Sequence, residues 1–316
     1  MARARAQPAT VAPMPSDLNP ALSPSRPGIR VSRAGGSALG RIREIISYRE
    51  LLVNLVRKEL KVKYKDSTLG FLWSLLNPAL YLVVFYVVFD LILQSGIPNF
   101  AFFLLSGLLV WNLFSLSLGG ATASIVSNGV LIKKVWFPRE VLPLASIGAN
   151  LVHFFLQSIV LVLALAIFRY PVGFRYLPLI PLALATLLLL LAGVTLLLAA
   201  ANVYLRDTQH LLELLLLAWF WLTPIVYPYR LVADKLGNRG SLVLLNPMVP
   251  IVSTFQRAIY NRTSGRTGDT VLPILPEAGY LWYVRNLAAL ALVSLVILVV
   301  AMAVFRRVEG NFAEEL

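Results

Sequence analysis

The chain has 316 residues, of which 58% are hydrophobic, with a mean hydropathy of +0.77 and a formal net charge of +13. A soluble domain is roughly 45–50% apolar, and the excess here lies in continuous uncharged runs that are typical of membrane-spanning helices. This composition excludes an ordinary soluble protein, and the absence of cysteine excludes disulfides and thiol catalysis. The positive charges lie mainly beside the apolar runs, which indicates membrane topology and contact with anionic lipids, with no nucleic acid as a partner.

The first 40 residues are rich in Ala, Pro, Ser, Gly and Arg and lack apolar periodicity. They predict a disordered cytoplasmic tail. The glycines from Gly35 to Gly40 have the spacing of a P-loop, but Arg41 and Ile42 stand where Lys and Ser or Thr are needed. No strand precedes them, so a nucleotide site is not expected in this chain.

Residues 41–68 predict an amphipathic helix on the membrane surface. Leu52, Leu55, Val56 and Leu60 recur at helical spacing, surrounded by basic residues. The basic residues that we assign to this interface helix are Arg49, Arg57, Lys58 and Lys61. Ten Lys and Arg residues fall between positions 30 and 65 and predict that this end is cytoplasmic.

Six spans are predicted within residues 69–310. They cover residues 72–93, 100–126, 141–168, 177–204, 211–227 and 287–305. An even number of spans places both termini on the same side of the membrane, here the cytoplasm. The predicted cytoplasmic C-terminus is residues 311–316. After residue 28, sixteen Lys and Arg fall on the predicted inside and nine on the outside, and the long 229–286 segment, which holds most of the nine, has little weight in the positive-inside rule.

The connection after the second span, residues 127–140, is unusually apolar for a segment that faces water. We single out Val130, Leu131, Lys133, Lys134, Val135, Trp136, Phe137 and Arg139. An apolar knob with a basic rim indicates a docking element. A turn at the lipid surface, anchored by two aromatic rings, explains the same residues, so both interpretations stay open.

Residues 246–260 have an apolar helical pattern that is too short and too interrupted to span a membrane. Such helices are re-entrant or interfacial. The predicted fold class is therefore an all-α integral membrane protein with six transmembrane helices, an N-terminal amphipathic interface helix and external re-entrant gate helices.

Aromatic side chains concentrate in spans one and five. Tyr81, Phe85 and Phe89 follow an i, i+4, i+8 pattern. Such rings bind sugar C–H groups, although ordinary packing and interfacial belts use them as well. The polar residues within the spans, such as Asp90 and His153, have neither the spacing of metal ligands nor that of a catalytic triad, so we expect no metal site and no catalysis.

The order of these parts resembles the permease subunit of ABC-2 type exporters, most closely the polysaccharide, O-antigen and teichoic-acid branch. The resemblance covers residues 41–310. It rests on Leu-Gly-Phe-Leu-Trp at 69–73, Lys-Lys-Val-Trp-Phe-Pro-Arg at 133–139, Leu-Thr-Pro-Ile-Val-Tyr at 222–227 and Leu-Asn-Pro at 245–247.

The resemblance implies a homodimer in the bacterial cytoplasmic (inner) membrane, bound to two copies of a separate ABC ATPase subunit. ATP and magnesium would bind to that subunit, so this chain would be a transport subunit with no cofactor of its own and no enzyme activity. Residues 130–137 would be the coupling helix, and the interface helix would also touch the ATPase. A channel for a lipid-linked glycan would be lined by Tyr81, Phe85, Phe89, Trp219, Trp221 and Tyr227, with an external gate at Asn246, Pro247, Phe255 and Tyr260.

Two alternatives remain. The same fold could export a drug or another lipid, although the aromatic content favours a sugar. In the second alternative, the chain is a membrane anchor that recruits cytoplasmic proteins and transports nothing. Neither the glycan nor its lipid carrier is identified by the residues.

Overall fold

Long apolar helices dominate the structure, a computed structural model that describes residues 38–93, 96–267 and 270–316. These residues belong to one unit, Gly36–Leu316. The predicted tail lies almost entirely outside the described residues, as does most of the glycine-rich stretch that precedes Arg41.

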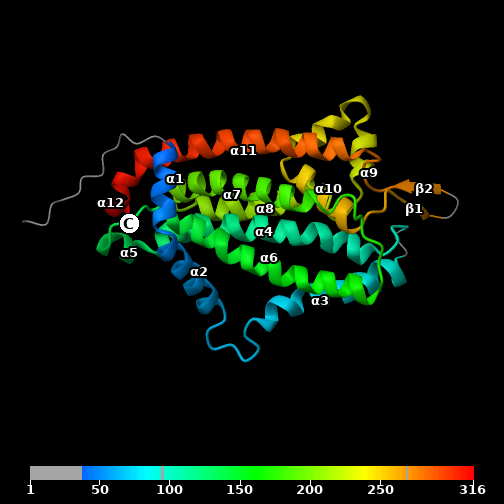
Figure 1. Cartoon of the computed structure of the whole chain (residues 1–316), viewed down its shortest axis with the longest axis horizontal. Helices are drawn as coiled ribbons and strands as arrows, with labels where there is room; N and C mark the ends of the chain where they lie inside the picture. The colour runs from blue at the N-terminus through cyan, green and yellow to red at the C-terminus, as the bar shows by residue number, and fades with distance from the viewer. Residues whose placement is uncertain (1–37, 94–95, 268–269) are drawn as a thin grey trace, which may run out of the picture. The chain divides into compact units, whose positions relative to one another are not determined.

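Within the described residues, five helices are long and apolar enough to cross a membrane. They are α3 (Leu72–Phe85), which continues as the π-helix η2 (Tyr86–Ile92), α4 (Phe100–Ser127), α6 (Val141–Ile167), α7 (Leu179–Tyr204) and α11 (Tyr280–Val308). Figure 1 shows α4, α6, α7 and α11 running side by side. The predicted helical membrane fold is confirmed.

Helix α4 lies at the centre of the bundle. In its most apolar stretch 83% of the residues are buried, compared with 6% in the first span. A small residue also allows close packing of α7 against α11. A Cβ atom at Gly193 of α7 would lie 2.9 Å from the backbone nitrogen of Leu298 in α11, so the two helices touch backbone to backbone, as is common in membrane bundles.

The fifth predicted span is shorter than expected. Helix α8 covers Thr208–Leu222, and its 15 residues extend about 22 Å, less than the roughly 30 Å of a bilayer core. The helix ends because Pro224 disfavours the helical conformation of the residue before it, and Thr223 is indeed extended.

The segment between α8 and α11 is built from short elements: α9 (Tyr229–Lys235), the 3-10 helix η3 (Gly237–Leu245), α10 (Met248–Ile259) and the strands β1 (Ser264–Thr267) and β2 (Thr270–Pro273). The strands pair as an antiparallel hairpin that the all-α prediction did not include. Helices η3 and α10 meet at 95°, the geometry of a broken span or a re-entrant loop, and together they raise the number of candidate spans among the described residues to six.

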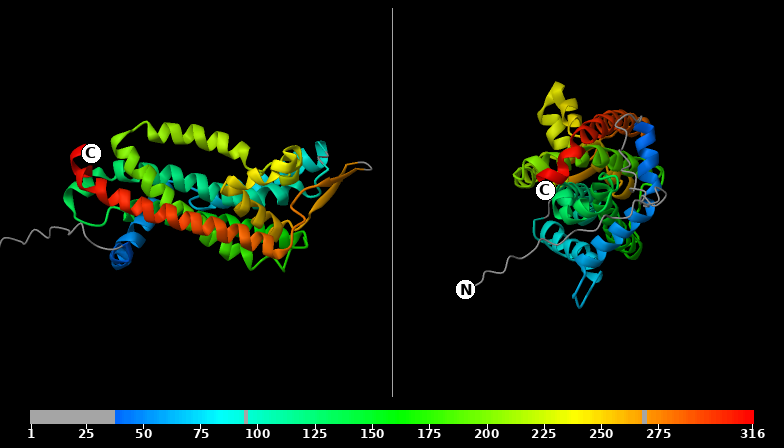
Figure 2. Two further views of the ribbon diagram at one scale, coloured as in Figure 1. Left: turned by 90° about the horizontal axis from the view of Figure 1, so that it is seen from above. Right: turned by 90° about the vertical axis from the view of Figure 1, so that its left-hand side faces the viewer.

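The segments predicted to be cytoplasmic gather at one end of the bundle. They are α1 (Ala38–Ser47), α2 (Arg49–Lys63), α5 (Gly129–Lys134), the 3-10 turn η4 (Glu309–Asn311) and α12 (Phe312–Glu315). Figures 1 and 2 show them opposite α9 and the β1–β2 hairpin. The predicted interface helix is thus two helices, interrupted at Tyr48, and α1 lies across the ends of the long helices (Figure 1).

Candidate functional site

The connection between α4 and α6 exposes apolar side chains, and we call residues 128–139 the docking segment. It consists of Asn128, which is the N-cap of α5, then α5 itself and a non-helical stretch. Val130 is 71% exposed, Val135 53% and Trp136 58%. An apolar group exposed to water costs free energy, so this pattern is typical of a surface that a protein partner or lipid covers.

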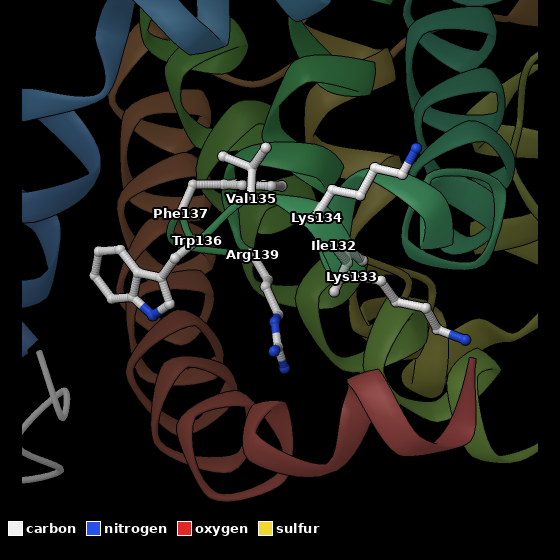
Figure 3. A pocket seen from close by; sticks show the side chains of 7 residues that line it. All are labelled: Ile132, Lys133, Lys134, Val135, Trp136, Phe137 and Arg139. Atoms are coloured by element: carbon white, nitrogen blue, oxygen red, sulfur yellow. The ribbon is translucent and has the colours of Figure 1, made fainter. Parts of the chain in front are cut away.

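A cavity of about 280 Å³ lies along the docking segment, lined by Ile132, Lys133, Lys134, Val135, Trp136, Phe137 and Arg139. Figure 3 shows Trp136 on one side and both lysines on the other, with Arg139 between them. The two lysines are exposed. The surface therefore combines an aromatic edge with positive charge, which fits an acidic or carbonyl-rich partner.

Phe137 holds the docking segment onto the bundle. Its side chain is 5% exposed and that of Ile132 is 7% exposed. Both belong to a buried cluster with Phe305 of α11 and Phe312 of α12, against which Leu131 packs. Phe137 is one of the residues predicted to form the docking element, and its ring lies in the core, where it fixes the position of its exposed neighbours.

The interface helix touches the docking segment at two points. The ring of Tyr48 lies edge-on to Trp136, with centroids 6.5 Å apart. The Nζ of Lys58 donates a 2.8 Å hydrogen bond to Oδ1 of Asn128, the residue before α5. All four basic residues assigned to the interface helix are exposed: Arg49, Arg57, Lys58 and Lys61. Two of the predicted sites thus form one continuous surface.

A cluster of ion pairs fastens α1 to this end. Arg41 donates from Nε and Nη2 to the two carboxylate oxygens of Glu140, at 2.7 and 2.8 Å. It also donates to Glu309 at 2.7 Å and to Glu44 at 2.9 Å. Desolvation by burial opposes the charged guanidinium, but hydrogen bonding and charge from Glu140, with the charge of Glu309, raise the pKa of Arg41 overall. Such two-pronged charge-assisted bonds fix geometry as well as charge.

Arg139 adds a second guanidinium beside this cluster. It lies over the ring of Phe312, 5.7 Å from the centroid. Its buried Nη1 has no hydrogen-bond partner among the described residues. Desolvation lowers the pKa of Arg139, although the charges of Glu309 and Glu140 act in the opposite direction. Because buried polar atoms in native proteins are nearly always paired, an acceptor from a bound partner or water fits this position.

The aromatic residues predicted in span one form a continuous row. Centroids of Tyr81 and Phe85, and of Phe85 and Phe89, are 5.9 Å apart. Phe89 then stacks on Phe100 of α4 at 4.2 Å. Tyr81 is exposed, whereas Phe85 and Phe89 are half-buried. The row can therefore offer ring faces to a ligand mainly at its Tyr81 end.

The row continues inward to Tyr260, the residue that follows α10. The ring centroids of Phe100 and Phe103 are 5.9 Å apart, and the ring of Phe103 lies edge-on to that of Tyr260 with centroids 5.4 Å apart. The Tyr260 hydroxyl donates to the carbonyl of Pro98 at 2.9 Å. Tyr260 and the predicted gate residue Phe255 are buried. Movement of α10 would therefore be transmitted to the row by direct ring contact.

Asn246 joins α8 to the beginning of α10. Its Oδ1 accepts from Nε1 of Trp219 at 2.8 Å and from the backbone of Met248 at 3.0 Å. Its Nδ2 donates to Oγ1 of Thr223 at 3.0 Å. Pro247 follows as the N-cap of α10. One predicted channel residue and one predicted gate residue are therefore hydrogen-bonded to each other.

The other two aromatic residues predicted in span five are Trp221, near the end of α8, and Tyr227, between α8 and α9. Trp221 is 59% exposed, and the Tyr227 hydroxyl donates to the Trp221 carbonyl at 2.6 Å. Within the described part of the chain, no ring contact joins them to the row on α3 and η2. The structure therefore does not bring the two sets of predicted channel residues together in one subunit.

Sequence reasoning missed two groups of residues. In the sequence, Arg41 is one of the ten basic residues before the first span and a mismatch to the P-loop pattern, and Glu140 is the end of a connection. Tyr64 and Ser74, which hydrogen-bond to Nδ1 of His153 at 2.9 and 3.1 Å, were not singled out at all. The available signal was a charged or polar residue at each helix boundary, and that signal does not identify partners across the fold.

The chain is similar to known membrane transport proteins over most of its length. Residues 50–260 match the family described as ABC-2 type transporter. The chain is 37% identical over 276 residues to the O-antigen export system permease protein RfbA of Myxococcus xanthus, which covers 87% of this chain and 98% of that protein. It is 28% identical over 267 residues to the protein of the same name from Klebsiella pneumoniae, covering 84% and 95%. It is 24% identical over 258 residues to the polysialic acid transport protein KpsM of Escherichia coli, covering 80% and 91%.

Proposed function

Because the chain belongs to the ABC-2 type transporter family, we propose that it is the permease subunit of an ATP-driven exporter that moves a lipid-linked polysaccharide or glycolipid across the bacterial cytoplasmic membrane. Its similarity to O-antigen and polysialic acid permeases over nearly their whole length supports this cargo. The observation that carries the proposal is the exposed docking segment at the end where the predicted cytoplasmic segments gather.

The partner at the docking segment is an ABC ATPase subunit. Val130, Val135 and Trp136 enter an apolar groove of that subunit, while the neighbouring lysines meet acidic groups on its rim. ATP and magnesium bind to the ATPase, and this chain contributes motion. The interface helix moves with the docking segment because Tyr48 and Lys58 contact it directly.

The permease works as a homodimer that binds two ATPase subunits. Exposed apolar side chains line α3 and α8, which both contact α4. Pairing two copies along these helices would bring the Tyr81 row of one subunit near Trp221 of the other and complete a wall that one subunit lacks. Aromatic walls hold sugars weakly at many points, which permits sliding.

Both termini lie in the cytoplasm, because α1, α2 and α12 lie at the end that carries the docking segment and the Lys and Arg residues between positions 30 and 65 favour the cytoplasmic side. The α10 region then faces the outer side and gates the exit. A polar glycan cannot cross hydrocarbon unaided, so closure of the ATPase supplies direction through the docking segment.

Export in living cells tests the proposal. In a strain depleted of this chain, we expect glycan to accumulate inside and to disappear from the surface, and the wild-type gene to restore it. The double variant Val130→Asp, Val135→Asp should reach the membrane normally yet lose the co-purifying ATPase and the surface glycan. Val271→Asp, at an equally apolar exposed position in β2, should behave as wild type. Normal surface glycan in the depleted strain would refute the proposal.

A further inference from the structure

A second cavity, of about 310 Å³, lies where α2 ends and α3 begins, against α4 and α6. Its volume is at the lower end of the range for small-molecule sites, roughly 300–1,000 Å³. One face of α3 lines it with Ser74, Asn77 and Tyr81, at i, i+3 and i+7. Asn112 of α4 and Gln157 of α6 project from two further helices. Three helix faces therefore converge on one space.

A buried polar network supports the wall of this cavity. The Tyr64 hydroxyl and Ser74 hydroxyl hydrogen-bond to each other, and both contact Nδ1 of His153, at 2.9 and 3.1 Å. The ring of Tyr64 also lies edge-on to the imidazole of His153, with ring centroids 5.6 Å apart. His153 and Ser74 are buried. The end of α2 and the beginning of α3 are thus both held against α6, which gives the cavity a defined shape.

Three amide side chains in the cavity have unused hydrogen-bonding capacity. No hydrogen bond joins the side chain of Asn77, Asn112 or Gln157 to another residue that the structure describes. Polar groups within membrane spans are costly and face protein, water or a ligand. An apolar cargo would leave these amides unpaired, whereas the hydroxyl and amide groups of a sugar would pair with them.

Lys63 supplies a positive charge at the same cavity. Among the described residues it forms no ion pair and no hydrogen bond. Its side chain is exposed, yet desolvation lowers the pKa of its ammonium group. A bound anion would restore the lost solvation and supply the missing counter-charge.

We propose that this cavity binds the phosphate-bearing head group of the lipid-linked glycan, with Lys63 holding the phosphate and the three amides holding the first sugar. The proposal rests on the proposed function and names the site at which that cargo is first held. Tyr81 belongs both to the cavity and to the aromatic row, so a sugar released from the amides meets the first ring of the row directly.

The test measures protection of a cysteine in the full permease–ATPase complex, held in phosphatidylcholine nanodiscs. The chain has no cysteine, so Leu116→Cys, at an exposed apolar position that lines the cavity, provides a single reporter for maleimide labelling. The probe is farnesyl diphosphate that carries one N-acetylglucosamine. Farnesol, farnesyl diphosphate and inorganic pyrophosphate are the comparison compounds.

We expect the sugar-bearing diphosphate to slow labelling, and Lys63→Gln to raise the protecting concentration about tenfold or more, as expected for the loss of a charge-assisted hydrogen bond. Lys63→Arg should restore protection. Lys65→Gln, a nearby exposed lysine that does not line the cavity, should change nothing. Gln157→Leu should weaken protection by the sugar-bearing probe and leave protection by farnesyl diphosphate unchanged.

Equal protection by farnesol would overturn the proposal, because it would identify a site for the hydrocarbon chain. Equal protection by inorganic pyrophosphate would overturn it as well, because the anion would then come from solution. Export of glycan is scored separately in cells. A wild-type complex that is protected but exports no glycan would sink the proposed function alone, and one that exports glycan without protection would sink the cavity assignment alone.

Discussion

The docking segment and α10 are both short apolar stretches between membrane helices, but they bury their side chains in opposite ways. Val130 and Trp136 point outward. In α10 every residue except Arg257 is buried, because α4, α7 and α11 all pack against it. Hydrophobicity alone therefore does not distinguish a surface that receives a partner from an element that completes the core, whereas contact on one side or on all sides does.

The difference also separates two kinds of mutational effect. Truncating a side chain in α10 removes packing that holds the subunit together. Truncating an exposed side chain of the docking segment leaves the subunit intact and removes only contacts with the partner. The following variants test whether stability and coupling divide in this way.

Phe255→Ala in α10 should have the largest effect. Phe255 is 2% exposed and lies edge-on to Phe154, and such truncations lower the free energy of unfolding by about 3–5 kcal/mol. Thermal unfolding in mild detergent measures the loss. Phe174→Ala, at a phenylalanine that is 77% exposed, should change stability by about 0.5 kcal/mol or less. Equal effects of the two variants would contradict the core role of α10.

Glu140→Gln should destabilise the end that carries the docking segment. Removing one partner of a buried ion pair typically costs about 3–5 kcal/mol, but Arg41 keeps Glu309 and Glu44, so we expect about 2–3 kcal/mol. Glu44→Gln, at a partly exposed carboxylate, should cost less than about 1 kcal/mol. Both are measured as shifts in thermal unfolding, and a larger effect of the Glu44 variant would show that Glu140 does not anchor the cluster.

Trp136→Ala should weaken binding of the ATPase and leave unfolding unchanged. An exposed aromatic anchor at an interface contributes about 2 kcal/mol, or roughly a 30-fold change in dissociation constant, measurable by titrating purified ATPase onto permease in nanodiscs. Phe137→Ala is the matched variant one residue away, and its buried ring predicts the reverse, a loss of stability. If the two variants gave the same result, the division between exposed and anchoring residues would be wrong.

The sequence was sufficient for features that depend on local composition. Uncharged runs predicted the spans closely: residues 100–126 correspond to α4, Phe100–Ser127, and 141–168 to α6, Val141–Ile167. The exposed character of Val130 and Trp136 followed from apolar residues placed in a basic connection. The shortened fifth span was also within reach, because Pro224 is visible in the sequence.

Contacts between distant residues could not be predicted in the same way. Arg41 and Glu140 are 99 residues apart, and Phe137 is buried because Phe305 and Phe312 return to it from the far end of the chain. In the sequence, Asn112 and Gln157 are isolated polar residues within apolar spans. Their common cavity exists because three helices present the right faces to one another, and periodicity within one helix does not specify its neighbours.

The smallest expected effect concerns the bond between the interface helix and the docking segment. Lys58 and Asn128 form an exposed hydrogen bond, which should contribute about 0.5–1 kcal/mol to stability. A double-mutant cycle with Lys58→Ala and Asn128→Ala isolates this term, and Lys65→Ala serves as the control. If the two helices move as one body, the same coupling energy should appear in ATPase affinity, because a partner that displaces the docking segment must also displace α2. Coupling in stability without coupling in affinity would mean that the docking segment moves alone, and the interface helix would then be a membrane anchor with no part in transmission.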